Sequence, residues 1–155
     1  MPPQPPSVTM APGETLITCL SPRLSVFLWR EATVLGLSAL ALLPLALLLR
    51  APEVWALVPL VLLMDLFAGQ TPLDWTRYRE TRWYLTSHRL IEIDLRNPEA
   101  PRSIALERIG RLRRLMFWRL FVVAEDGEIL TLAYVPALPE LQQRLTDLRN
   151  AAGTK

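Results

Sequence analysis

The sequence has few of the residues that most often build disulfide, metal and nucleotide sites. It contains one cysteine, one histidine and six glycines among 155 residues. A lone cysteine excludes an intrachain disulfide framework, and one cysteine with one histidine excludes a zinc site made from these residue types within the chain. With 14 prolines against so few glycines, a glycine-rich phosphate loop is also disfavoured. We therefore expect no metal and no cofactor.

The chain also lacks a large net charge. Its formal charge of +2 is too small for a nucleic-acid-binding polycation. Charges are unevenly spread, because 14 of the 17 basic and 11 of the 15 acidic residues follow residue 68. The mean hydropathy of +0.23 is high for a soluble domain and low for a chain embedded throughout in a membrane. These values indicate two unequal parts, one of them in a bilayer.

An uncharged, strongly apolar run covers residues 32–49. As a helix, 18 residues would extend about 27 Å, close to the thickness of the hydrocarbon core. Trp29 and Arg30 precede the run and Arg50 follows it, as expected for anchors at the two membrane interfaces. A buried helix of a soluble core is the alternative. The pattern favours a membrane span over about residues 30–49.

A second apolar run, residues 54–68, follows after a short link that contains a proline. Two spans joined so closely must be antiparallel neighbours, so we predict a transmembrane hairpin over residues 29–72, with its second span over about 53–70. Both termini then lie on one side. The basic residues after the second span place that side in the cytoplasm, by the positive-inside rule, and hence the protein in the bacterial inner (cytoplasmic) membrane.

Asp65 is the intramembrane polar residue of the second predicted span, about one turn from its end. A carboxylate within a bilayer suggests a functional group. Its position near the end also fits a side chain that reaches the headgroups or contacts the first helix. The sequence favours this second interpretation.

Beyond residue 74 the pattern changes to short β-prone segments. Within residues 89–95 three apolar side chains are spaced two apart, with acidic side chains between them: Ile91, Ile93 and Leu95, with Glu92 and Asp94. This period of two predicts a half-buried strand whose isoleucines face the core and whose acids face solvent. Further strands are expected at 83–86, 103–106, 119–124 and 128–134, the last two joined by a turn at Asp126 and Gly127.

The C-terminal segment has the pattern of an amphipathic helix. Pro139 opens it, and four leucines at spacings of three and four form one apolar stripe: Leu138, Leu141, Leu145 and Leu148. Residues 108–118 are ambiguous, because their apolar residues fit either a helical stripe or a bent strand with arginines outward. An amphipathic helix on the membrane surface would have a similar composition.

This order resembles the bacterial PH-like domains that follow a pair of transmembrane helices. The resemblance rests on Thr81–Ile91 (TRWYLTSHRLI), Arg102–Ile109 (RSIALERI), the closing strand at 128–134 and the leucine-striped helix, and on the lead-in from Gly13. It covers about residues 13–150. The bulky, glycine-free segment 115–119 departs from the family, whose members usually carry glycines there.

The resemblance implies a small antiparallel β-barrel or sandwich closed by a C-terminal helix and tethered to the membrane by the α-helical hairpin. Together with the proline-rich start and the two apolar runs, it divides the chain into a disordered proline-rich tail (1–13), a lead-in (14–28), the hairpin (29–72) and the PH-like domain (74–151). Domains of this kind bind lipid headgroups or proteins and are not enzymes.

Catalytic groupings are scarce in the sequence. Cys19 is far in sequence from His88, which is expected to be an exposed turn residue and not a catalytic base. The alternating acids Glu92 and Asp94 occupy positions that are expected to face solvent, so they do not indicate a pair of catalytic carboxylates. We expect no catalytic residues.

The basic stretch at 102–119 is the strongest candidate site, with six arginines and one acid. Anionic membrane lipids or an acidic membrane protein partner are the expected ligands, and a solvated charged face is the alternative. The candidate contact residues are Arg108, Arg111, Arg113, Arg114, Trp118 and Arg119.

Two functions are consistent with these features. The first is a membrane-anchored interaction module at the cytoplasmic face, which would bind a protein partner or anionic headgroups and assist assembly of a membrane complex. The second is a structural subunit of a larger membrane complex that uses the hairpin as its interface.

Overall fold

The structure, a computed structural model, describes residues 10–49, 59 and 71–152. Internal contacts divide the chain into two compact units. The first unit, which we call the β-unit, combines Met1–Val26 with Tyr78–Lys155 and contains all the described strands. The second unit consists of Phe27–Arg77.

The strands of the described residues are β1 (Leu16–Leu20), β2 (Thr81–Thr86), β3 (Arg89–Asp94), β4 (Arg102–Ala105), β5 (Ile109–Leu115), β6 (Arg119–Ala124) and β7 (Ile129–Ala133). The helices are α1 (Leu24–Leu49), α3 (Thr71–Tyr78), the short 3-10 helix η1 (Leu106–Arg108) and α4 (Leu138–Ala152). The sequence-predicted strands, the hairpin turn at Asp126–Gly127 and the C-terminal helix are therefore confirmed.

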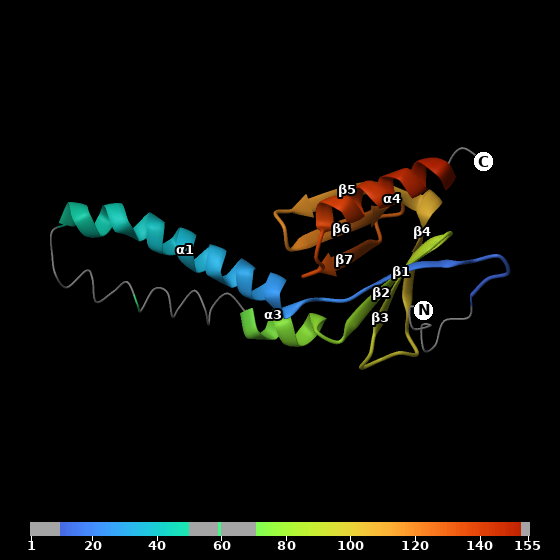
Figure 1. Cartoon of the computed structure of the whole chain (residues 1–155), viewed down its shortest axis with the longest axis horizontal. Helices are drawn as coiled ribbons and strands as arrows, with labels where there is room; N and C mark the ends of the chain where they lie inside the picture. The colour runs from blue at the N-terminus through green and yellow to red at the C-terminus, as the bar shows by residue number, and fades with distance from the viewer. Residues whose placement is uncertain (1–9, 50–58, 60–70, 153–155) are drawn as a thin grey trace. The chain divides into compact units, whose positions relative to one another are not determined.

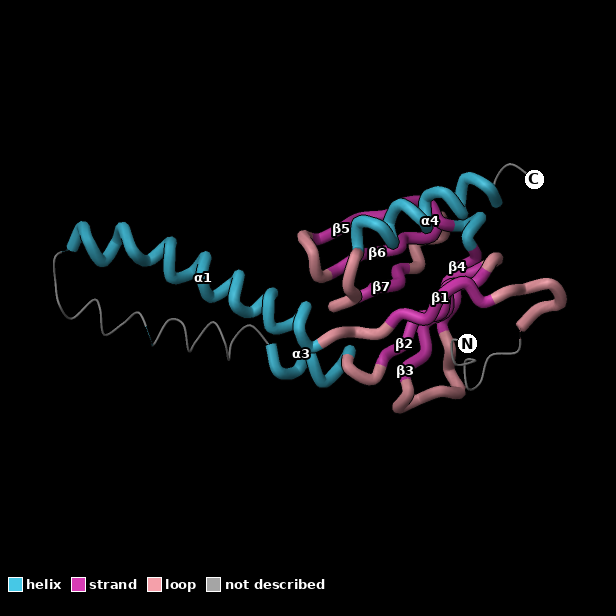
Figure 2. Tube along the Cα trace, in the orientation of Figure 1, coloured by secondary structure: helices cyan, strands magenta, loops and turns pink. Residues whose placement is uncertain are grey.

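The strands form two antiparallel sheets, one in the order β1-β2-β3-β4 and the other in the order β5-β6-β7 (Figures 1 and 2). Strand β1 comes from the lead-in and pairs with β2, placing Leu20 opposite Trp83 and Cys19 opposite Tyr84. The lead-in, which the sequence predicts as a separate segment, thus contributes an edge strand to the β-unit.

Both sheets and α4 share one apolar core. Helix α4 lies against the three-stranded sheet and η1 (Figure 2). The core takes side chains from each layer: Trp83, Leu85, Leu90 and Ile104 from the first sheet, Ile109, Leu120, Val122, Leu130 and Leu132 from the second, and Leu138, Leu141 and Leu145 from α4. The leucine stripe of α4 therefore faces the core, as the spacing predicts.

Of the predicted barrel or sandwich, the closed barrel is not confirmed. In the described part of the chain no strand pairing joins β4 to β5 or β1 to β7, so the two sheets remain separate. The interruption lies at η1, which separates β4 from β5. The architecture is therefore two packed antiparallel sheets with a helix over the shared core.

The predicted alternation of β3 is confirmed in part, because Ile91 and Ile93 are buried on one face, but the opposite face is buried as well. The shared core receives Leu90, whereas Ile91 and Ile93 form a second buried cluster with Tyr84 on the other face of the sheet. Leu95 lies beyond the strand and is 42% exposed. Alternation alone could not show that both faces of this sheet are buried.

A buried ion pair fixes the lead-in to the β2–β3 turn. The Glu14 carboxylate accepts hydrogen bonds from Arg89 Nε at 2.9 Å and Arg89 Nη2 at 3.0 Å, and from the Thr86 hydroxyl at 2.7 Å. The Ala11 backbone N–H also donates to it at 2.9 Å. Mainly because of Arg89, the pKa of Glu14 is lowered to about 2, even though burial opposes the charged form.

The second unit contains most of the long helix α1. This helix starts at Leu24, earlier than predicted, because the residues that follow Pro22 contain nothing that breaks a helix. Its 18-residue stretch Leu24–Ala41 is the one segment of the described residues that is long and apolar enough to cross a membrane, and only 11% of it is buried.

The other predicted span, over residues 53–70, lies outside the described residues apart from residue 59, and so does Asp65. The structure therefore describes the first helix of the predicted hairpin, α1, and not the second. After this segment, α3 precedes the β-unit, and its Trp75 ring lies 5.1 Å from the ring of Phe27.

Candidate functional site

The arginine-rich segment that was ambiguous in sequence is a strand. Residues Ile109–Leu115 form β5, which pairs with β6 through a register shift between Ile109 and Arg111. This shift explains the mixed pattern, because an extra residue in one strand displaces the side-chain alternation by one position. Leu112 packs against the core, while Arg111 and Arg113 lie on the outer face.

The outer face of the three-stranded sheet carries rows of side chains fixed by strand register. Arg111 lies opposite Val123, which lies opposite Ile129, and Arg113 lies opposite Phe121 in the next row. Residues paired across antiparallel strands have Cβ atoms about 5 Å apart. Each arginine of β5 therefore stands beside an apolar side chain of β6.

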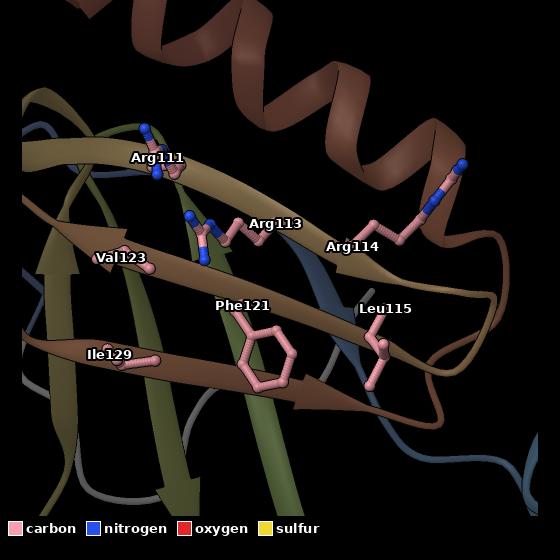
Figure 3. A pocket seen from close by; sticks show the side chains of 7 residues that line it. All are labelled: Arg111, Arg113, Arg114, Leu115, Phe121, Val123 and Ile129. Carbon is pink, nitrogen blue, oxygen red and sulfur yellow. The ribbon is translucent and has the colours of Figure 1, made fainter.

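These rows line an open groove of about 490 Å³ (Figure 3). We call it the arginine groove and define it by its lining residues: Arg111, Arg113, Arg114, Leu115, Phe121, Val123 and Ile129. Its floor is apolar, and Ile129 is 49% exposed. In Figure 3 the side chain of Arg113 extends over β6, whereas that of Arg114 extends in the opposite direction, toward α4.

The arginines of the groove have no acidic partner among the described residues. The ion pairs found there involve other cations, and none includes Arg111, Arg113 or Arg114. All three side chains are exposed. The groove therefore combines uncompensated positive charge along one side with an apolar floor, an arrangement that suits a ligand with an anionic group beside an apolar one.

Other arginines of the same stretch are already engaged by the fold. Arg108 pairs with Asp126, and Arg102 lies 3.5 Å from Glu128, so the β6–β7 turn neutralises both. The guanidinium of Arg119 lies 5.8 Å from the centre of the Tyr78 ring. Arg102, Arg108 and Arg119 therefore contact other parts of the fold, unlike the three arginines that line the groove.

The predicted site is thus only partly assembled. The structure places Arg111 and Arg113 on one face of β5 and Arg114 at the edge of the groove with its side chain toward α4, and it places Arg108 and Arg119 in the contacts above. Trp118 is 7% exposed and packs edge-on against Phe117, with the ring centres 4.8 Å apart, so it does not line the groove. His88 is exposed in the β2–β3 turn, where Ser87 Oγ lies 2.8 Å from its Nδ1.

Sequence reasoning missed the apolar floor of the groove, namely Leu115, Phe121, Val123 and Ile129. A signal was present in β6, where the run Leu120–Ala124 is apolar at every position. A strand with one solvated face would alternate, so an unbroken apolar run indicates that its outer side chains also meet an apolar surface or ligand.

Comparisons of the chain with family models, curated proteins and solved structures give no significant match.

Proposed function

We propose that this chain is a membrane-anchored, PH-like interaction module of the bacterial inner membrane. Helix α1 anchors it, and the β-unit binds an anionic partner at the cytoplasmic face through the arginine groove. The partner is an acidic segment of a membrane protein, whose assembly into a complex the module assists, or the headgroup of an anionic lipid.

The observation that carries this proposal is the set of three exposed arginines without acidic partners among the described residues, placed beside an apolar groove. Each basic group near an anionic membrane surface contributes about 1 kcal/mol of binding free energy. Two features strengthen the effect of such modest energies. Anchoring keeps the local concentration of ligand high, and the apolar floor adds burial that a purely charged face lacks.

The exposed apolar surface of α1 supports the anchor. Leu37 is 54% and Leu40 is 63% exposed, and Trp29 is 70% exposed near the start of the helix. Large apolar side chains arranged in this way along a helix need an apolar surrounding, and the bilayer supplies one.

The experiment compares two double charge reversals in the full chain, held in phosphatidylcholine nanodiscs. One variant carries Arg111→Glu and Arg113→Glu in the groove. The matched control carries Arg144→Glu and Arg149→Glu on α4, which changes the net charge equally. The probes are phosphatidylglycerol vesicles and a labelled peptide of alternating glutamate and leucine, with binding followed by fluorescence.

We expect the groove variant to bind at least one probe about tenfold or more weakly than the wild type, because two favourable charges become repulsive. The control variant should bind like the wild type. A loss with vesicles alone identifies a lipid ligand, and a loss with the peptide alone identifies a protein segment. The proposal fails if both variants bind alike or if the wild type binds neither probe.

A further inference from the structure

The turn between β5 and β6 presents an apolar tip, which we define as Leu115, Met116 and Phe117. Their exposed fractions are 45%, 53% and 40%. Met116 adopts a φ of 50°, a left-handed conformation that non-glycine residues seldom adopt. Consecutive large apolar side chains exposed at the end of a hairpin are unfavourable in water, which indicates a surface made to meet something apolar.

The tip lies at the end of the β-unit where the chain leaves it and returns to it. The Tyr134 N–H donates to the carbonyl oxygen of Trp118 at 2.7 Å, and the Tyr134 carbonyl accepts from the Arg23 N–H at 2.9 Å. The ring of Tyr78 packs edge-on against that of Tyr134, with the ring centres 6.1 Å apart. Trp118, Arg23 and Tyr78 therefore all meet at Tyr134.

These contacts join the tip to the two places where the chain leaves and re-enters the β-unit. Arg23 directly precedes α1, and Tyr78 is the residue at which the chain re-enters the β-unit after Phe27–Arg77. Both connections between the β-unit and Phe27–Arg77 therefore leave from the end of the β-unit that carries the tip.

Charge next to the tip favours an anionic surface. Arg113 and Arg114 directly precede Leu115, and neither has an ion-pair partner in the described part of the chain. Apolar side chains flanked by basic ones are typical of segments that bind at the membrane interface, where the apolar groups enter by about 5–10 Å and the cations meet anionic headgroups.

We propose that the apolar tip is a second membrane contact, which inserts into the anionic leaflet beside the anchor. The proposal rests on the membrane anchoring in the proposed function. The tip shares Leu115 with the arginine groove and adds Met116 and Phe117, which do not line it. The tip fixes the β-unit against the bilayer, so that the unit has two attachments instead of one.

The test measures how deeply the tip enters the bilayer. Cys19→Ser removes the single native thiol, and Met116→Cys then carries an environment-sensitive fluorophore in the full chain. The matched control is Glu125→Cys, whose label lies at the other end of β6, about 20 Å away for a six-residue strand. Both proteins are reconstituted in vesicles of phosphatidylglycerol and phosphatidylcholine that contain lipids with a quencher near the headgroup.

We expect a blue-shifted emission and several-fold stronger quenching at Met116 than at Glu125. Adding Arg113→Glu and Arg114→Glu to the Met116-labelled protein should lower the quenching toward that of the control. Equal quenching at both positions in reconstituted protein would overturn the tip contact and leave the proposed function intact. A chain that fails to enter the vesicles at all would instead overturn the membrane anchor and both proposals with it.

Discussion

Glu14 is the residue that connects the N-terminal lead-in to the first sheet. Its side chain is fully buried, whereas that of Arg89 is 29% exposed. The carboxylate accepts two hydrogen bonds from the guanidinium, and such bidentate, charge-assisted pairs are stronger than hydrogen bonds between neutral groups. Removing one partner of a buried pair leaves the other without compensation, which costs more than the pair itself contributes.

We predict that Glu14 makes the stability of the β-unit depend on pH. The carboxyl has a pKa of about 2 in the folded chain, against 4.5 for an ordinary glutamate. A lowered folded pKa gives stability that is fully present above pH 4.5 and is lost as the pH falls toward 2. The shift corresponds to about 3 kcal/mol of unfolding free energy.

Denaturant unfolding of the full chain, followed by tryptophan fluorescence at several pH values, measures this effect. Glu14→Gln should lower the unfolding free energy at neutral pH by about 2–3 kcal/mol. It should also make the unfolding free energy depend less on pH between pH 5 and 2. Glu99→Gln, on the exposed loop between β3 and β4, serves as the control and should change little. Equal stabilities of Glu14→Gln and the wild type at neutral pH would contradict this role.

At the scale of elements, β1 shows why the β-unit is made from two separated parts of the chain. Strand β1 covers one edge of β2, and its Leu20 packs against the shared core. A fragment that begins at residue 78 would expose the β2 edge, and an open apolar edge favours aggregation. The sequence-based domain, which starts at residue 74, lacks this strand too.

We therefore predict different behaviour for two truncated proteins. A protein that joins residues 10–26 to 78–155 through a flexible glycine-serine linker should be monomeric and unfold cooperatively. Residues 78–155 alone should aggregate or unfold at a clearly lower temperature, because they lack both β1 and the Glu14 ion pair. Thermal unfolding by circular dichroism and size-exclusion chromatography compare the two. The importance of β1 would be refuted if both proteins had the same stability and size.

The sequence predicts the elements whose signals are local. The hairpin between β6 and β7 follows from Asp126–Gly127, where Gly127 has a φ of 87°, and α4 follows from its leucine spacing. The pairing of β1 with β2 joins residues more than 60 positions apart, so no local pattern reports it. The displaced register at Gly110 likewise hides the strand character of β5.

The candidate site is predicted in part for the same reason. Charge density identifies the arginine stretch, but it does not distinguish Arg108 from Arg111. Arg108 of η1 pairs with Asp126 of the β6–β7 turn, whereas Arg111 has no acidic partner among the described residues. That difference depends on which strands are neighbours. The apolar floor belongs to β6 and β7, and it joins the arginines of β5 only after the sheet forms.

At the scale of the whole molecule, the chain separates an apolar helix from a charged β-unit. The apolar stretch of α1 is largely unburied, whereas the β-unit has a complete core and carries the arginine groove and the apolar tip. The proposals for the groove and the tip name the ligand and the membrane contact of the β-unit. Both depend on the proposal that α1 holds the chain in a bilayer.

Extraction of the full chain from cell membranes with alkaline carbonate tests that proposal most directly. This treatment removes proteins attached by charge or by surface contact and leaves those with inserted apolar segments. We predict that the wild-type chain stays in the membrane pellet, and that Leu37→Arg combined with Leu40→Arg shifts it to the supernatant, because charges in the bilayer interior are costly. Release of the wild-type chain as an intact, folded protein would contradict the account.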